Sequence, residues 1–228
     1  MRSKYDCNWV GIDGGREGLW KEPIWSDVLR IISKHRGERV YDPKSAIYAE
    51  LERAFPKEAW RSTTAEGHFR PLFRDYPNSW TRTAVVSLSN QVFQLTTQGE
   101  ALLAKKTSKS DVLMDMFRRH SEYCDFHQAH EKPFAILAAG ILAAPRSLTT
   151  KEVFWAVMKN FRPGEDDLSD VLKKSRKGPL ADPSPTPYRR LRNMLTLMRT
   201  AEAVQTTRRG PSTVWSPLKA ALLEEITQ

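Results

Sequence analysis

The residues most able to do chemistry lie near the C-terminus, where arginines alternate with apolar side chains. The stretch YRRLRNMLTLMRTAEAVQTTRRGPSTVW, from Tyr188 to Trp215, contains six arginines and one acidic residue. The segment from Lys173 to Gly210 contains ten Lys and Arg but only two Asp and Glu, which gives a net charge of +8. The whole chain carries +9, with a pI near 9.6, so this segment concentrates nearly all of the surplus charge. Such a segment favours binding to a polyanion, with nucleic acid first among the candidates.

Residues 187–200 have the periodicity of an amphipathic helix. The apolar side chains that share one side of it are Tyr188, Leu191, Met194, Leu195 and Met198. The residues expected to face duplex DNA are Arg189, Arg190, Arg192, Asn193 and Thr196. A helix fits the major groove, where Arg pairs with guanine and Asn with adenine, while flanking arginines neutralise phosphates. Arg199 falls nearer the apolar edge, as a hinge or backbone contact, and Leu197 falls on the exposed side.

A pair of arginines follows this helix at a turn between two β-like segments. Arg208 and Arg209 precede Gly210 there, and we expect both to contact DNA along its backbone or in its minor groove. The alternative for the whole basic segment is a solvated surface packed on its apolar side.

A second basic stretch lies earlier in the chain, with a helix expected near residues 64–76. Pro71 and Pro77 limit the length of that helix. The residues expected to contact DNA from this stretch are Arg70, Arg74, Asn78, Thr81 and Arg82.

Catalytic and metal-binding patterns are sparse. Asp13 with Asp42-Pro43-Lys44 is the only set that resembles a metal-dependent nuclease motif, and Pro43 suits a helix start better than a strand. The sequence also contains the run His120, Cys124, His127 and His130. One helix cannot surround a zinc ion, so these side chains are either part of a core-facing stripe or an incomplete metal site. We expect no catalytic residue and no cofactor.

The remaining elements suggest an approximate repeat of about 100 residues in a mainly α protein with small β-hairpins (α+β). Residues 1–22, rich in glycine, are expected to form an arm, and residues 108–131 a linker helix. The repeated unit is helix, helix, basic helix, hairpin and short helix, over 23–107 and again over 132–228. The matches between copies include Arg82-Thr83-Ala84 with Arg199-Thr200-Ala201, and Val92-Phe93 with Val214-Trp215. Thr149 and Glu152 have the spacing of a capping box.

This order of elements is the winged-helix plan, and two motifs strengthen the likeness. The string WTRTA followed by VFQLTTQGEALL resembles the amino-terminal winged helix of Mrr-type restriction proteins. The residues that carry the resemblance are Trp80, Arg82, Thr83, Leu95, Thr96 and Gly99, with Arg199, Thr200, Arg209 and Gly210 in the second copy. The pair of units also resembles the recognition half of type IIS restriction endonucleases.

The resemblance implies two tandem winged-helix domains that bind a specific double-stranded DNA site for a restriction or defence nuclease, with cleavage supplied by another domain or subunit. A winged-helix module that binds proteins or regulates transcription is the main alternative, and a metal-dependent nuclease the second. Two cysteines, no leader-like start and no long apolar run predict a cytoplasmic protein without a membrane span.

Overall fold

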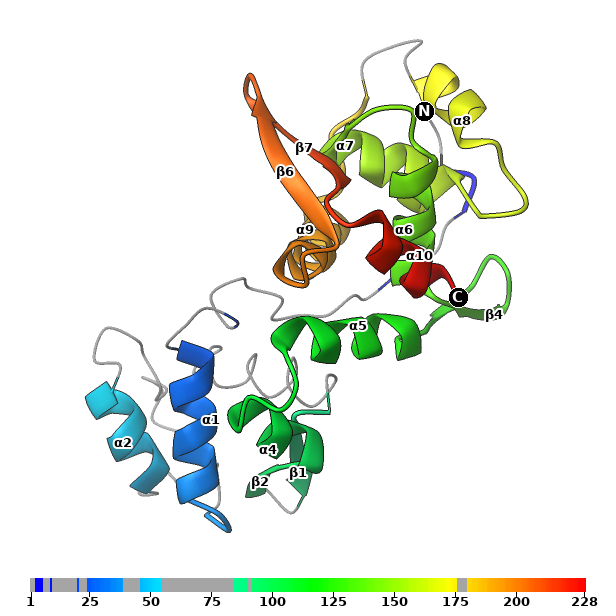
Figure 1. The fold of residues 1–228 in the computed structure, drawn as a ribbon. Coiled ribbons are helices and arrows are strands. Elements are labelled where there is room, and N and C mark those ends of the chain that lie inside the picture. The colour runs from blue at the N-terminus through cyan, green and yellow to red at the C-terminus, as the bar shows by residue number, and fades with distance from the viewer. Residues whose placement is uncertain are drawn as a thin grey trace. The chain divides into compact units, whose positions relative to one another are not determined.

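The computed structural model describes residues 3–5, 9, 20, 24–38, 46–54, 84–89, 92–175 and 180–228 (Figure 1). Over these residues the fold is mixed, with helices and small antiparallel sheets, which confirms the expected α+β class. The chain forms two compact units. The N-terminal unit comprises Ile12–Val112, and the C-terminal unit comprises Leu113–Gln228 together with Met1–Gly11. None of the described helices is long and apolar enough to cross a bilayer.

The described elements of the N-terminal unit follow the expected order. They are α1 (Ile24–Lys34), α2 (Ala46–Ala54), β1 (Val86–Ser89), β2 (Val92–Leu95) and α4 (Thr97–Leu103). The expected apolar stripe of α1, at Trp25, Val28, Leu29 and Ile32, is buried. Gly37 ends that helix region with a φ of +86°, a left-handed conformation that glycine adopts without strain.

Thr96 joins the hairpin β1–β2 to α4. Its backbone N–H donates to Val85 O at 3.1 Å, and its side chain accepts from Gly99 N at 3.0 Å as the N-cap of α4. A Cβ on Gly99 would lie 2.1 Å from Val85 O, so only glycine permits this close approach. The Leu-Thr-x-x-Gly motif therefore has a structural role: it closes the hairpin onto the helix.

The expected linker helix over 108–131 is only half correct. α5 spans Lys109–Arg119, and an antiparallel hairpin of β3 (Glu122–Cys124) and β4 (Ala129–Glu131) follows it. Gln128, with a φ of +50°, lies in the turn. Glu131 is drawn into the core by a buried ion pair with Arg162, a contact distant in sequence that helical periodicity does not reveal.

The C-terminal unit places helices around a three-stranded antiparallel sheet. Its further elements are α6 (Pro133–Ala143), β5 (Leu148–Thr149), α7 (Thr150–Glu152), η2 (Val153–Met158), α8 (Leu168–Ser175), α9 (Pro185–Thr200), β6 (Val204–Arg209), β7 (Ser212–Pro217) and α10 (Ala220–Thr227). The sheet order is β5-β7-β6. The capping box of Thr149 and Glu152 is present and starts α7, as expected. Trp215 Nε1 donates to Thr150 Oγ1 at 2.9 Å and fixes β7 to that helix start.

The described aromatic residues of the expected N-terminal arm are packed into the protein, whereas Ser3 and Lys4 are exposed. Tyr5, Trp9 and Trp20 are at most 1% exposed. Tyr5 N donates to Lys159 O at 3.0 Å, and the guanidinium carbon of Arg162 lies 4.3 Å from the centre of the Tyr5 ring. Aromatic burial and this cation–π contact therefore hold the described part of residues 1–11 against the C-terminal unit.

The two hairpins agree in detail, although each belongs to a different unit. Ala84 and Glu202, with φ of +56° and +61°, stand two residues before β1 and β6 respectively. Val86 pairs with Leu95, as Val204 pairs with Pro217. The residue that follows each second strand donates its backbone N–H across the hairpin. Thr96 N donates to Val85 O, and Leu218 N donates to Ala203 O. The match of Val92 with Val214 is thus supported, whereas Ala84 corresponds to Glu202, one residue later than the sequence match suggested.

Candidate nucleic-acid interface

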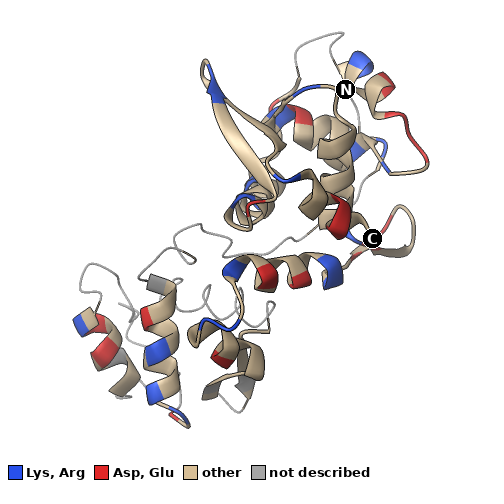
Figure 2. Ribbon diagram, in the orientation of Figure 1, with Lys and Arg blue, Asp and Glu red and all other residues tan. Residues whose placement is uncertain are grey.

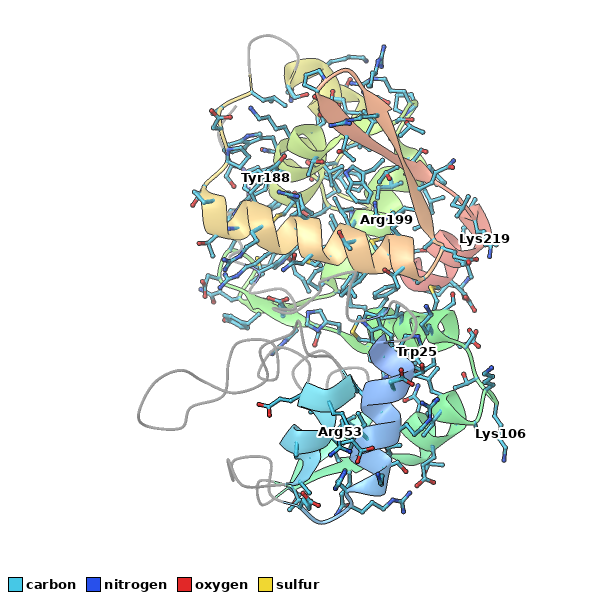
Figure 3. All side chains as sticks on the ribbon, turned by 90° about the vertical axis from the view of Figure 1, so that its left-hand side faces the viewer. Trp25, Arg53, Lys106, Tyr188, Arg199 and Lys219 are labelled. Atoms are coloured by element: carbon cyan, nitrogen blue, oxygen red, sulfur yellow. The ribbon has the colours of Figure 1, made fainter. Side chains whose placement is uncertain are left out.

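α9 is the expected basic helix, and it spans Pro185–Thr200. In Figure 3, Tyr188 and Arg199 mark its two ends, and the helix lies across the near side of the C-terminal unit. Leu191, Met194, Leu195 and Met198 are at most 1% exposed, which confirms four positions of the expected apolar side. Tyr188 is half-buried, and its ring lies edge-on to Phe154 of η2, with 5.9 Å between the centroids.

The outward side of α9 carries most of the residues expected there. Arg189 and Arg192 are exposed, and Asn193 and Thr196 are partly exposed. These four follow one another at helical spacing along a single stripe.

One flank of α9 differs from expectation. Leu197 is fully buried rather than exposed, and Arg190, seven residues earlier on the same flank, is half-buried. The Nε atom of Arg190 is buried and has no hydrogen-bond partner among the described residues. Arg190 therefore lies at the margin of the exposed stripe, because the buried surface of α9 is wider than its sequence periodicity indicates.

The hairpin β6–β7 is fixed to the end of α9. Arg199 Nη1 donates to Thr206 Oγ1 of β6 at 3.3 Å. Arg208 pairs with Thr213 and Arg209 with Ser212, and both arginines are exposed. Gly210, with a φ of +60°, forms the turn, so both arginines lie at the far end of the hairpin, as the sequence predicted (Figure 2).

The charges on α9 and the hairpin tip are not neutralised within the described part of the chain. None of its ion pairs involves Arg189, Arg190, Arg192, Arg208 or Arg209. Most other cations of the C-terminal unit have acidic partners: Lys151 pairs with Asp182, and Lys219 with Glu202. Available positive charge is thus concentrated on the surface formed by the outward side of α9 and the hairpin tip, called the basic surface below.

A feature that sequence reasoning missed lies beside the hairpin tip. Arg209 and Ser212 line a hollow of about 480 Å³ together with Arg146, Thr149 and Glu152. Arg146 and Glu152 form an ion pair there. No sequence spacing connects residues 146 and 209, since they come together only through the pairing of β5 with β7 and of β7 with β6.

The other predicted DNA contacts, Arg70, Arg74, Asn78, Thr81 and Arg82, lie outside the described residues. So do Asp13 and Asp42-Pro43-Lys44, the positions of the nuclease alternative.

The histidine and cysteine run does not form a helical stripe. Cys124, His127 and Glu131 come together instead, with one candidate ligand atom from each within 4.8 Å of the others. Cys124 is disulfide-bonded, however, and this differs from the free thiol expected in a reducing compartment. Both Glu131 oxygens accept hydrogen bonds from Arg162, at 2.7 and 3.0 Å. Both oxygens of the Glu131 carboxylate are therefore already paired with Arg162.

His120 and His130 of the same run lie apart from that cluster's ligand set. His120 Nε2 is 2.8 Å from Glu122 Oε1, and the exposed His130 packs edge-on to Tyr123.

No protein-family model matches the chain, and no curated protein resembles it closely enough to count as a relative.

Proposed function

We propose that the protein binds double-stranded DNA through the basic surface of its C-terminal unit, with α9 in the major groove and the hairpin β6–β7 against the backbone or minor groove. The observation that carries this proposal is the set of arginines on α9 and the hairpin tip without acidic partners among the described residues. Arginine without an internal partner can neutralise phosphates and read guanine with two donors.

The order of elements supports a winged helix as the scaffold. α6, β5, the helix of α7 and η2, α9, β6 and β7 follow the sequence of parts expected for that fold, with α8 inserted before α9. The matching hairpins support the proposal of two tandem copies. On this basis we propose a target-recognition module of a restriction or defence nuclease, as the resemblance to Mrr-type and type IIS recognition domains implies.

A protein-binding module is the second candidate, and one observation favours it. Tyr123 and Phe126, on the hairpin β3–β4 and its turn, are 52% and 53% exposed. Exposed aromatic side chains are enriched at protein interfaces. The two functions are compatible, since a recognition module must attach to the nuclease that it directs.

Duplex binding by substituted proteins tests the proposal. Arg189→Ala or Asn193→Ala should weaken binding to the preferred site by about 1–3 kcal/mol and leave binding to random duplex nearly unchanged. Arg118→Ala is a suitable control, because Arg118 is exposed on α5 and pairs with Glu225 at 3.4 Å. Equal losses on preferred and random duplex would limit both residues to phosphate contacts, and no loss on either would contradict the proposed surface.

A further inference from the structure

The hollow beside the hairpin tip brings together two arginines from distant parts of the chain. Arg209 comes from the end of β6 and Arg146 from the segment before β5, and Ser212 adds a hydroxyl from β7. The hollow measures about 480 Å³, within the range of roughly 300–1,000 Å³ that is usual for ligand sites. Charged and hydroxyl-bearing side chains form its walls, which suits an ionic ligand better than an apolar one.

The charges around the hollow favour an anion. Glu152 is its one acidic wall residue, and its carboxylate is already occupied on both oxygens. Arg146 Nη2 donates to Glu152 Oε1, while Thr149 N donates to Glu152 Oε2 at 2.8 Å. Although burial alone would raise the pKa of Glu152, these bonds hold it below its usual value, so the group stays ionised.

Arg209 has no such partner. Two guanidinium groups and one ionised carboxylate leave a net charge of +1 around the hollow. Arg209 makes no ion pair with any acidic residue that the structure describes. Its exposed guanidinium can therefore donate outward, with Ser212 Oγ, directly opposite across the hairpin, as a second donor.

We propose that this hollow binds one phosphodiester group of the DNA backbone, held by Arg209 and Ser212 and supported by the positive field of Arg146. The inference rests on the proposed function, because it names a backbone contact of the same basic surface. Thr149 and Glu152 form the capping box at the start of α7, which the bond from Trp215 to Thr150 joins to β7, and Arg146 is held there by its ion pair with Glu152. One wall of the hollow is therefore fixed by these contacts, and the hairpin tip forms the other wall.

The test compares Arg209→Gln and Ser212→Ala with Arg208→Gln. Arg208 is the neighbouring exposed arginine, but it does not line the hollow, so it is a matched control. Duplex affinity is measured against salt concentration, with unmodified DNA and with duplexes that carry one neutral methylphosphonate at successive positions. Arg209→Gln should reduce affinity about tenfold on preferred and random duplex alike, and lower the salt slope by about one.

At one methylphosphonate position Arg209→Gln should cause no further loss, whereas Arg208→Gln should still weaken binding. An unchanged salt slope for Arg209→Gln, together with losses that no methylphosphonate position removes, would overturn the phosphate seat.

Two further outcomes separate this inference from the proposed function. If Arg189→Ala weakens duplex binding but Arg209→Gln and Ser212→Ala do not, the seat fails and the proposed function stands. If the protein does not bind duplex at all, both fail. Calorimetry with inorganic phosphate distinguishes the source of the anion. Phosphate binding that Arg209→Gln abolishes, without any effect on duplex, would assign the hollow to a free anion and overturn the backbone contact.

Discussion

Arg199 Nη1 and Thr206 Oγ1 lie 3.3 Å apart and join the last turn of α9 to the middle of β6. Only residues 201–203 separate the end of α9 from the start of β6. This bond therefore helps to set the direction in which Arg208 and Arg209 point relative to the outward side of α9. The contact thus joins the two parts of the basic surface.

Loss of that contact should weaken binding without changing its specificity. Thr206→Val removes the acceptor and keeps the shape of the side chain, at a cost of about 1 kcal/mol in the free energy of unfolding. We expect equal losses of affinity on preferred and random duplex, measured by fluorescence anisotropy. Gln205→Val is the control, because its side chain lies on the other side of β6 and bonds Pro217 O. A loss confined to the preferred site would show that Thr206 contributes to base recognition instead.

The contact between α6 and η2 depends on the absence of a side chain. A Cβ on Gly140 would lie 2.3 Å from Val157 Cγ1, closer than two carbon atoms can approach. Gly140→Ala should therefore lower the free energy of unfolding by about 1–3 kcal/mol, as overpacked cores do, in urea titrations followed by circular dichroism. The double variant Gly140→Ala with Val157→Ala should regain part of the loss. Equal stability of the single variant and the unaltered protein would contradict this packing.

The buried pair of Arg162 and Glu131 should be costly to break from one side. Their side chains are only 4% and 8% exposed, and Trp9 Nε1 also donates to Glu131, at 3.1 Å. Glu131→Gln should lower the free energy of unfolding by about 3–5 kcal/mol, because it leaves the Arg162 charge buried without a compensating carboxylate. The double variant Glu131→Leu with Arg162→Met should cost less. A double variant less stable than Glu131→Gln would argue that the hydrogen bonds, rather than charge balance, stabilise the pair.

The same pair predicts an acid limit to stability. Burial alone would raise the pKa of Glu131, but the hydrogen bonds and charge of Arg162 outweigh it and hold this pKa below its usual value of 4.5. A depressed folded-state pKa stabilises the protein above about pH 4.5, and that stability is lost as pH falls through the folded value. Stability measured from pH 6 down to acid should therefore fall less steeply for Glu131→Gln. If stability fell equally with pH in the two proteins, the lowered pKa of Glu131 would not be the source of the acid limit.

His35 should give the N-terminal unit the opposite pH dependence. Its Nδ1 lies 2.7 Å from Glu38 Oε1, and its Nε2 lies 2.7 Å from Glu50 Oε2. Burial alone would lower the pKa of His35, but the bonds to Glu50 and Glu38 raise it above the usual 6.5. The stabilisation is therefore complete below about pH 6.5 and is lost as pH rises through the folded value. His35→Gln should flatten this dependence in thermal melts across that range, and an unaltered slope would contradict it.

Local patterns predicted most elements, because each depends on neighbours in sequence. The stripe of α1, the capping box at Thr149 and the hairpin turn at Gly210 all agree with the structure. Residues 122–131 form a hairpin rather than the expected helix, and Leu197 is buried rather than exposed, because contacts with residues distant in sequence determine both. Charge and spacing alone were enough to select the arginines of α9 and of the hairpin tip as candidate DNA contacts. Arg146 and Ser212 could not, because only the sheet order β5-β7-β6 brings them to one place.

Selection from a randomised duplex pool, with modified and unmodified cytosine and adenine included, tests the central claim most directly. The unaltered protein should enrich one defined sequence. Arg189→Ala with Asn193→Ala should lose preference at one or two base positions and keep most of its affinity for random DNA. Recovery of no preferred sequence by the unaltered protein, or of the same sequence by both proteins, would contradict recognition of DNA by α9.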